Sequence, residues 1–245
     1  MTKGIVDVVL PLYLKDLGIA IVGIGFIFSL APVIGIIAQS IIAVHSDVVG
    51  RKGYFSLTFL LKSAAHGFYS ICTIPTGFAA LNTLDSLSEN LRSTVEMPLI
   101  VEITPKEKLG RIVSAYWGIL SVAIAVGMGI SGIITTLIGY FWLFLLCSFI
   151  SLVGLILIQT ARIPPFKRKN VSFNFRKMFD FRQLGWNLKV LFLIGFVMSF
   201  AFSLLERFAF PIFLREDLKA DSTFIGVIIG FSWLIMAMPA IVWRK

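Results

Sequence analysis

The sequence LPLYLKD at residues 10–16 returns as FPIFLRE at residues 210–216, an offset of 200 residues. All seven positions match in kind, including a proline, an aromatic residue and a base followed by an acid. Agreement among apolar residues arises easily by chance, but the proline, the aromatic residue and the ordered charge pair do not. The two heptapeptides therefore predict an internal duplication in which both copies cross a membrane in the same orientation.

The composition around the heptapeptides is that of a membrane protein. Of 245 residues, 58% are hydrophobic and 14% charged, whereas soluble domains average about 45–50% and 25%. Apolar runs long enough to span a bilayer recur along the chain. We predict an all-α polytopic membrane protein with about eight transmembrane helices, the first of them short. The expected spans are Gly4–Leu14, Ala20–Val44, Tyr54–Ile74, Gly77–Ile103, Ile112–Leu137, Phe141–Thr160, Lys189–Leu214 and Ser222–Val242.

The net charge of +9 is explained by topology rather than by nucleic-acid binding. The loops after the even-numbered spans and the C-terminus hold 15 Lys and Arg, and the opposite face holds 3. The positive-inside rule then makes the loops after helices 2, 4 and 6 cytoplasmic, in a multi-pass protein of the plasma membrane. Both cysteines lie in apolar runs, so we expect no disulfide framework, metal or cofactor, and the lipid bilayer is the expected surrounding.

We divide the chain into an N-terminal six-helix repeat (1–161), a basic cytoplasmic linker (162–188) and the first two helices of a second repeat (189–245). The linker interleaves phenylalanines with basic residues, which suits a short helix on the inner leaflet or a solvated connection. About 20 residues precede Pro211 in its span, but only ten precede Pro11. We therefore expect a fragment of a protein of about twelve helices, with a site between the halves.

The stretch AVHSDVVGRK at residues 43–52 lies between the second and third spans. It resembles the G-x-x-x-D-R-x-G-R-K loop of the major facilitator superfamily, because Asp47, Gly50, Arg51 and Lys52 match that pattern. Ala43 and Val48 depart from it. The resemblance covers nearly the whole chain and implies a helix bundle in which these four residues form a cytoplasmic gating loop. A carboxylate at the start of the third helix would also be stabilised by the partial positive charge at that end of the helix. The alternative is a basic turn that only sets topology.

The fifth span carries a weaker likeness to the antiporter motif of the same family. Two glycines match, and serine, glycine and threonines stand at the other positions. Small residues let helices approach closely whether or not a protein is an antiporter. We therefore interpret four positions as helix-packing glycines: Gly118, Gly127, Gly129 and Gly132.

The fourth span has a polar stripe that ordinary structural helices do not tolerate. Its charged members are spaced four, three and four residues apart, which places them within an arc of roughly 60° along about 16 Å. Each charge at the bilayer centre costs about 2.5–3.5 kcal/mol, so the stripe must face water or partners. The stripe consists of Asp85, Glu89, Arg92 and Glu96, extended outward by Asn82.

Arg92 is within reach of Glu89 and Glu96, which leaves the stripe two negative charges in surplus. That surplus would bind a cationic solute, pair with bases on other helices or take up protons; a purely structural ion-pair network is the alternative. The resemblance implies that Asp7, Glu206 and Arg207 line the same transport cavity. We interpret Lys62 as a structural partner of a stripe acid, and His66 as an interhelical hydrogen-bonding residue rather than a proton relay.

These features predict a secondary active transporter that moves a small solute by alternating access, with proton coupling as one use of the acids. An intramembrane enzyme is disfavoured, because the chain has only two histidines and no H-E-x-x-H motif. The remaining alternatives are a non-transporting remnant and a subunit of a split transporter whose C-terminal helices form a separate chain. The sequence names neither the solute, the direction of transport, the coupling ion nor the oligomeric state.

Overall fold

The computed structural model describes residues 1–161, 185–204 and 209–242. Side chains are described throughout these ranges except at positions 36, 37, 40, 44, 47, 48, 199–204 and 236–242. Most of the predicted linker therefore lies outside the described residues. So do Glu206 and Arg207, two of the expected cavity residues, and the side chain of Asp47.

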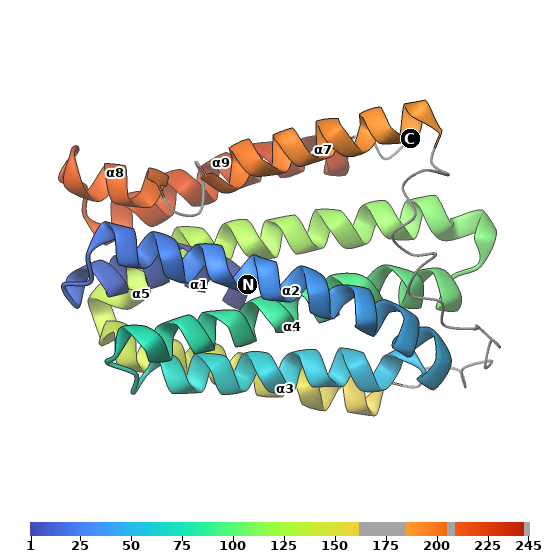
Figure 1. The fold of residues 1–245 in the computed structure, drawn as a ribbon, viewed down its shortest axis with the longest axis horizontal. Coiled ribbons are helices and arrows are strands. Elements are labelled where there is room, and N and C mark those ends of the chain that lie inside the picture. The colour runs from blue at the N-terminus through green and yellow to red at the C-terminus, as the bar shows by residue number, and fades with distance from the viewer. Residues whose placement is uncertain (162–184, 205–208, 243–245) are drawn as a thin grey trace.

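All secondary structure in the described ranges is helical, and the long helices run side by side as a bundle (Figure 1). The elements are α1 (Thr2–Asp16), α2 (Ile21–Val49), α3 (Arg51–Tyr69), α4 (Pro75–Ile103), the 3₁₀ turn η1 (Lys106–Lys108), α5 (Leu109–Thr160), α7 (Trp186–Leu204), α8 (Phe210–Glu216) and α9 (Ser222–Val242). The prediction of a helix over Ser222–Val242 is confirmed with the same bounds.

The long helix α5 is two membrane-length arms joined at Gly139. This residue has φ of 76°, a left-handed conformation that glycine adopts without the steric cost borne by other residues. The chain reverses there, so the arms run antiparallel (Figure 1). The break falls between the two spans that the sequence predicts, Ile112–Leu137 and Phe141–Thr160. A turn residue thus sets the boundary between the two arms.

The junction of α2 and α3 differs from the prediction. α2 continues to Val49 and α3 begins at Arg51, so that Gly50 alone, with φ of 111°, separates them. Asp47 consequently lies in the last turn of α2. The expectation that Asp47 stands at the positive start of the third helix was wrong, because the polar residues before Gly50 extend α2 rather than forming a loop.

Helix α1 forms the centre of the apolar core. One side packs in a cluster with the rings of Tyr69, Phe78 and Phe144 from α3, α4 and α5. The other side, through Val8 and Leu12, packs in a second cluster with residues of α5, α8 and α9. α1 is therefore buried between α2–α4 on one side and α8 and α9 on the other, with α5 contributing to both clusters.

Close helix contacts occur where α5 carries glycines. A Cβ at Gly132 would lie 2.0 Å from the carbonyl oxygen of Ser222, and one at Gly127 would lie 2.3 Å from that of Met1. A Cβ at Gly129 would meet nothing, but the backbone nitrogen of Gly129 lies 2.6 Å from where a Cβ of Gly230 would be. Gly118 is buried. The α5–α9 and α1–α5 contacts thus depend on the absence of side chains.

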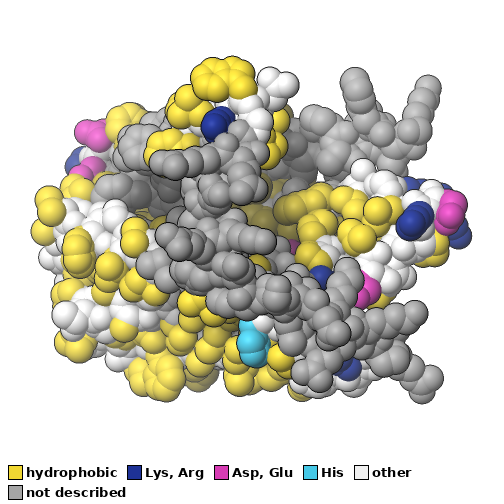
Figure 2. Space-filling view, turned by 45° about the vertical axis from the view of Figure 1, so that its right-hand side comes forward, with side chains coloured by type: hydrophobic (Ala, Val, Ile, Leu, Met, Phe, Trp, Pro, Cys, Tyr) yellow, Lys and Arg dark blue, Asp and Glu magenta, His cyan; other side chains and the backbone are white. Residues whose placement is uncertain are grey.

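Large apolar side chains cover much of the visible outer surface (Figure 2). Leu137 is 77% exposed and Ile119 70% exposed, a pattern expected where lipid replaces water. In the described ranges one continuous helical stretch, Lys106–Thr160, is long and apolar enough to cross a membrane. Ile21–Gly35, Trp186–Met198 and Ser222–Ile235 are shorter apolar helices. The apolar residues of α4 are interrupted by its charges.

Candidate functional site

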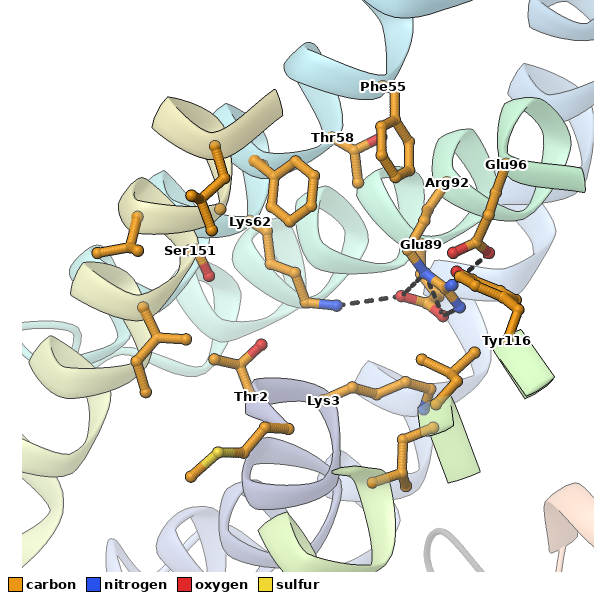
Figure 3. A pocket seen from close by; sticks show the side chains of 18 residues that line it. Thr2, Lys3, Phe55, Thr58, Lys62, Glu89, Arg92, Glu96, Tyr116 and Ser151 are labelled. Carbon is orange, nitrogen blue, oxygen red and sulfur yellow. Dashed lines mark hydrogen bonds and ion pairs between the residues drawn. The ribbon is translucent and has the colours of Figure 1, made fainter. Parts of the chain in front are cut away.

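The polar stripe of α4 is held together by Arg92. Its Nε lies 3.2 Å from each carboxylate oxygen of Glu89, one turn earlier, and its Nη1 donates to Glu96, one turn later (Figure 3). The spacing i+3 and i+4 on one helix brings all three side chains to the same face. One guanidinium therefore bridges two carboxylates, as the sequence predicts.

Helix α3 supplies a second cation to the stripe. Lys62 Nζ lies 3.0 Å from Glu89 Oε2. Lys62 is 7% exposed and Glu96 is 5% exposed, so these ends of the network are withdrawn from solvent. Buried charges are tolerated only when paired. The four residues Lys62, Glu89, Arg92 and Glu96 form a continuous line of alternating charge, called the buried row below.

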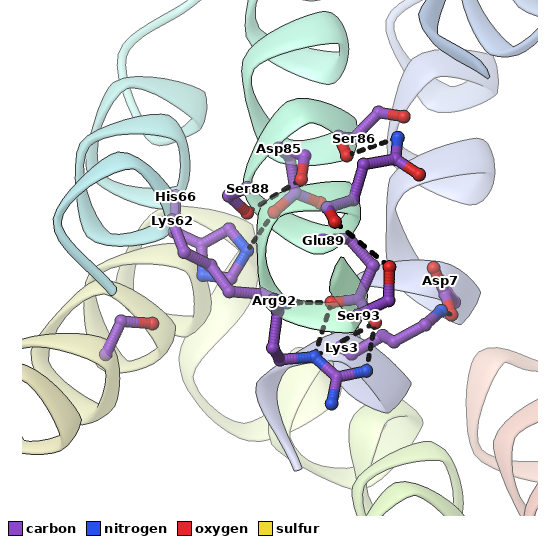
Figure 4. Close-up of polar contacts among 12 residues, drawn as sticks. Lys3, Asp7, Lys62, His66, Asp85, Ser86, Ser88, Glu89, Arg92 and Ser93 are labelled. Carbon is purple, nitrogen blue, oxygen red and sulfur yellow. Dashed lines mark hydrogen bonds and ion pairs between the residues drawn. The ribbon is translucent and has the colours of Figure 1, made fainter. Parts of the chain in front are cut away.

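A second α3–α4 contact lies next to the buried row. The ring of His66, which is fully buried, points toward Asp85, with 3.4 Å between Nε2 and Oδ1 (Figure 4). The ring also stacks on Tyr69, with 6.4 Å between the ring centroids. Two α3 residues one turn apart thus face two α4 acids one turn apart.

Two of the expected cavity residues make contacts elsewhere. Asp7 pairs with Lys3 on its own helix. Asn82 donates from Nδ2 to the carbonyl oxygen of Ile27 at 3.0 Å, which ties α4 to α2. Neither of them, nor Asp85, lines the cavity beside the buried row.

That cavity has a volume of about 400 Å³ and is bordered by α1, α3, α4 and both arms of α5. The buried row and Lys3 are its charged part (Figure 3). Phe55, Phe59 and Tyr116 are the aromatic part of an otherwise largely aliphatic wall. All residues that line this cavity precede position 161, and a site between the two halves stays a prediction. The stripe faces α3, whose Lys62 pairs with Glu89, and the cavity separates it from the α5 arms.

The gating-loop residues lie where α3 begins. Arg51 Nη1 is 3.0 Å from Glu102 Oε2 at the end of α4. Lys52 Nζ donates to the carbonyl oxygens of Gln159 and Ala161 at 3.0 and 2.8 Å. A lysine suits this place, because the last carbonyls of a helix have no partner within it and carry partial negative charge. The start of α3 is thereby fastened to the ends of α4 and α5.

Sequence reasoning missed part of this arrangement. Lys62 was expected as a partner of a stripe acid, but not as a cavity residue, and its charge inside an apolar run was the available signal. Nothing in the sequence singled out Lys3 as a cavity residue. The aromatic wall gave no signal either, because an aromatic residue in a membrane helix faces lipid as readily as a cavity. In the described ranges, no three His, Cys, Asp or Glu side chains converge in a group able to hold a metal ion.

Comparison with known proteins agrees with this architecture. Residues 1–245 match the family model of the Major Facilitator Superfamily. A curated relative, an uncharacterized MFS-type transporter of Methanocaldococcus jannaschii, is 25% identical over 178 residues. The match covers 71% of this chain and 44% of the relative, so the chain matches less than half the length of that protein. The chain belongs to the major facilitator superfamily, whose members are polytopic helical membrane proteins.

Proposed function

We propose that this protein is a secondary active transporter that moves a small solute across the plasma membrane by alternating access. The observation that carries the proposal is the buried row along a cavity of about 400 Å³, within the size range of small-molecule sites. Charges inside a membrane are costly, and those found within membrane proteins mark solute and ion pathways. Family membership supports the same function. Residues 1–161 and 189–245 are proposed as one repeat and the start of a second, joined by a cytoplasmic linker.

The buried row also suggests how a coupling ion would act. Arg92 contacts both Glu89 and Glu96, so a movement of its guanidinium leaves one carboxylate without that partner. A buried carboxylate without a cation gains by binding a proton or a cationic solute. We propose Glu89 and Glu96 as the coupling acids, with Asp7, Asn82 and Asp85 as supporting residues and Glu206 and Arg207 as their counterparts near the second heptapeptide.

The contacts of the gating loop support a role in closing the cytoplasmic end. Arg51 and Lys52 bind the ends of α4 and α5, and these contacts must break if the helix ends separate. Asp47 belongs to the same gating loop by resemblance to the family, and on that ground Asp47→Asn is expected to slow solute flux without abolishing solute binding. Unchanged turnover in this variant would remove the gating role.

Flux through reconstituted protein tests the transport proposal. Purified protein in liposomes with a trapped pH-sensitive dye is exposed to a panel of amino acids, sugars, organic acids and lipophilic amines, with and without a pH gradient. We expect at least one class to move and to carry protons, and Glu89→Gln or Glu96→Gln to abolish the coupled flux. Glu107→Gln, on the exposed η1 turn, is the matched control.

The outcomes separate the alternatives. Full coupled flux in both glutamine variants would exclude the proposed coupling acids. Flux that does not depend on the pH gradient would indicate a transporter without proton coupling. No flux of any class by correctly inserted protein would contradict the transporter and favour a remnant or a subunit of a split transporter.

A further inference from the structure

Each heptapeptide ends in a base followed by an acid. The base of each heptapeptide pairs with the acid of the other. Lys15 at the end of α1 pairs with Glu216 at the end of α8. Asp16 Oδ1 lies 3.6 Å from Arg215 Nη2. Position 15 corresponds to 215 and position 16 to 216 at the offset of the repeat. Each ion pair therefore joins a residue of one heptapeptide to the non-equivalent residue of the other.

This reciprocity is the contact pattern of a two-fold axis, in which residue i meets j and residue j meets i. The ends of the two helices are also alike. The carbonyl oxygen of Leu14 accepts from the nitrogen of Ile19 at 3.1 Å, and that of Leu214 accepts from the nitrogen of Ala220 at 3.0 Å. The turn after α8 is one residue longer. Two similar helix ends thus face each other across a local pseudo-two-fold axis.

Each member of the Asp16–Arg215 pair is also held from its own side. Tyr140, directly after the reversal at Gly139, donates its hydroxyl hydrogen to Asp16 Oδ2 at 2.6 Å. Arg215 Nη1 donates to Ser222 Oγ, at the start of α9, at 3.3 Å. The α5 reversal and the start of α9 therefore position these two charges toward each other.

We propose that Lys15, Asp16, Arg215 and Glu216 form a charge clasp that holds this end of the bundle closed. α1 and α8 meet at the clasp, so separating the two ends of the chain here requires both pairs to break. The side chains are 33–39% exposed, which leaves water able to solvate each charge when the clasp opens. The idea that solute passes when the clasp opens rests on the proposed transport function. The closure itself does not depend on that function.

The order of the charges tests the clasp without changing composition. The swap Lys15→Asp with Asp16→Lys keeps the net charge but places like charges opposite Glu216 and Arg215. Adding Arg215→Glu with Glu216→Arg restores two attractive pairs in reversed order. Spin labels at the neighbouring exposed positions Leu17 and Leu218 report the separation by pulsed electron paramagnetic resonance. The background is Cys72→Ala with Cys147→Ala, which removes both native cysteines.

We expect one predominant short distance in the unswapped protein without solute. The swap in one heptapeptide should raise the ratio of longer to shorter distances about fivefold, the shift that the loss of weak ion pairs produces in a two-state equilibrium. The swap in both should bring the ratio back toward its original value, short of it by the lost Tyr140–Asp16 hydrogen bond. An unchanged distribution after the single swap, or no recovery from the single swap to the double swap, would overturn the clasp.

A neutral pair of substitutions covers a failure of the swapped chain to fold. Lys15→Gln with Asp16→Asn removes both attractions without adding repulsion, and we expect a smaller rise in the same ratio. No rise in this variant overturns the clasp as well. Because distances are measured without solute, the clasp can hold in a protein that moves none of the tested solutes, and flux can occur in a protein without the clasp.

Discussion

The buried row and the clasp are built from the same residue types in different surroundings. The side chains of the buried row are 6–24% exposed, whereas those of the clasp are 33–39% exposed. The buried row joins α3 to α4, and the clasp joins α1 to α8. The difference in exposure means that breaking a pair costs more in the buried row than in the clasp.

Burial determines how much each pair contributes. In the interior, removal of one partner leaves a charge that water solvates poorly, at a cost of about 3–5 kcal/mol. Near the surface water replaces the lost partner, and exposed pairs contribute about 0.2–1 kcal/mol. We therefore expect substitutions to rank by how many ion pairs they break and how buried those pairs are, rather than by ion-pair distance.

The largest effect is expected from Arg92→Met, which leaves two neighbouring carboxylates without their shared cation. We expect the free energy of unfolding to fall by about 3–5 kcal/mol. Chemical unfolding of the purified protein in mixed micelles, followed by circular dichroism, measures it. Arg111→Met, at an exposed position of α5, is the control. A loss no larger than in the control would contradict the interpretation of Arg92 as the bridge.

Lys62→Met should have a smaller effect, because Glu89 keeps Arg92 as a partner. A loss of about 1.5–3 kcal/mol is expected for one hydrogen bond to a charged group. The same unfolding assay on Lys62→Met, Glu89→Gln and the double variant gives the coupling energy between the two positions. Strictly additive losses would show that Lys62 and Glu89 do not interact.

Arg51→Gln sharpens the comparison at an intermediate site, where the Arg51 side chain is 14% exposed and that of Glu102 is 40% exposed. We expect a loss of about 1 kcal/mol, near the upper limit for partly exposed pairs. Lys106→Gln, on the same end of the bundle and exposed, should change stability less. A loss as large as that of Arg92→Met would break the ranking by burial.

Lys15→Gln should have the smallest effect on the free energy of unfolding, about 0.2–1 kcal/mol. Repeating the unfolding in about 1 M NaCl, where the screening length is about 3 Å, should bring the variant and the unsubstituted protein together. The same salt should leave the loss in Lys62→Met largely intact, because buried pairs are screened much less. A Lys15→Gln loss that persists in salt would place the clasp among the buried contacts.

Local features of the fold could be predicted from the sequence alone. The helix Ser222–Val242, the break at residue 139 and the shared face of Glu89, Arg92 and Glu96 follow from apolar run length, turn chemistry and helical period. Each of these depends on residues close together in the chain. The boundary between α2 and α3 was less predictable. Polar residues near a helix end either continue the helix or form a loop, and the two conformations have similar free energies.

Only the tertiary structure decided which charges meet. The sequence showed Lys62 and the stripe acids, but the pairing with Glu89 depends on how α3 and α4 are rotated against each other. It showed the base and acid of both heptapeptides, but their reciprocal contact depends on how α1 packs against α8. The cavity within residues 1–161 depends on both α5 arms. Helical period fixes the face on which a side chain lies, whereas its partner is set by the packing of helices distant in sequence.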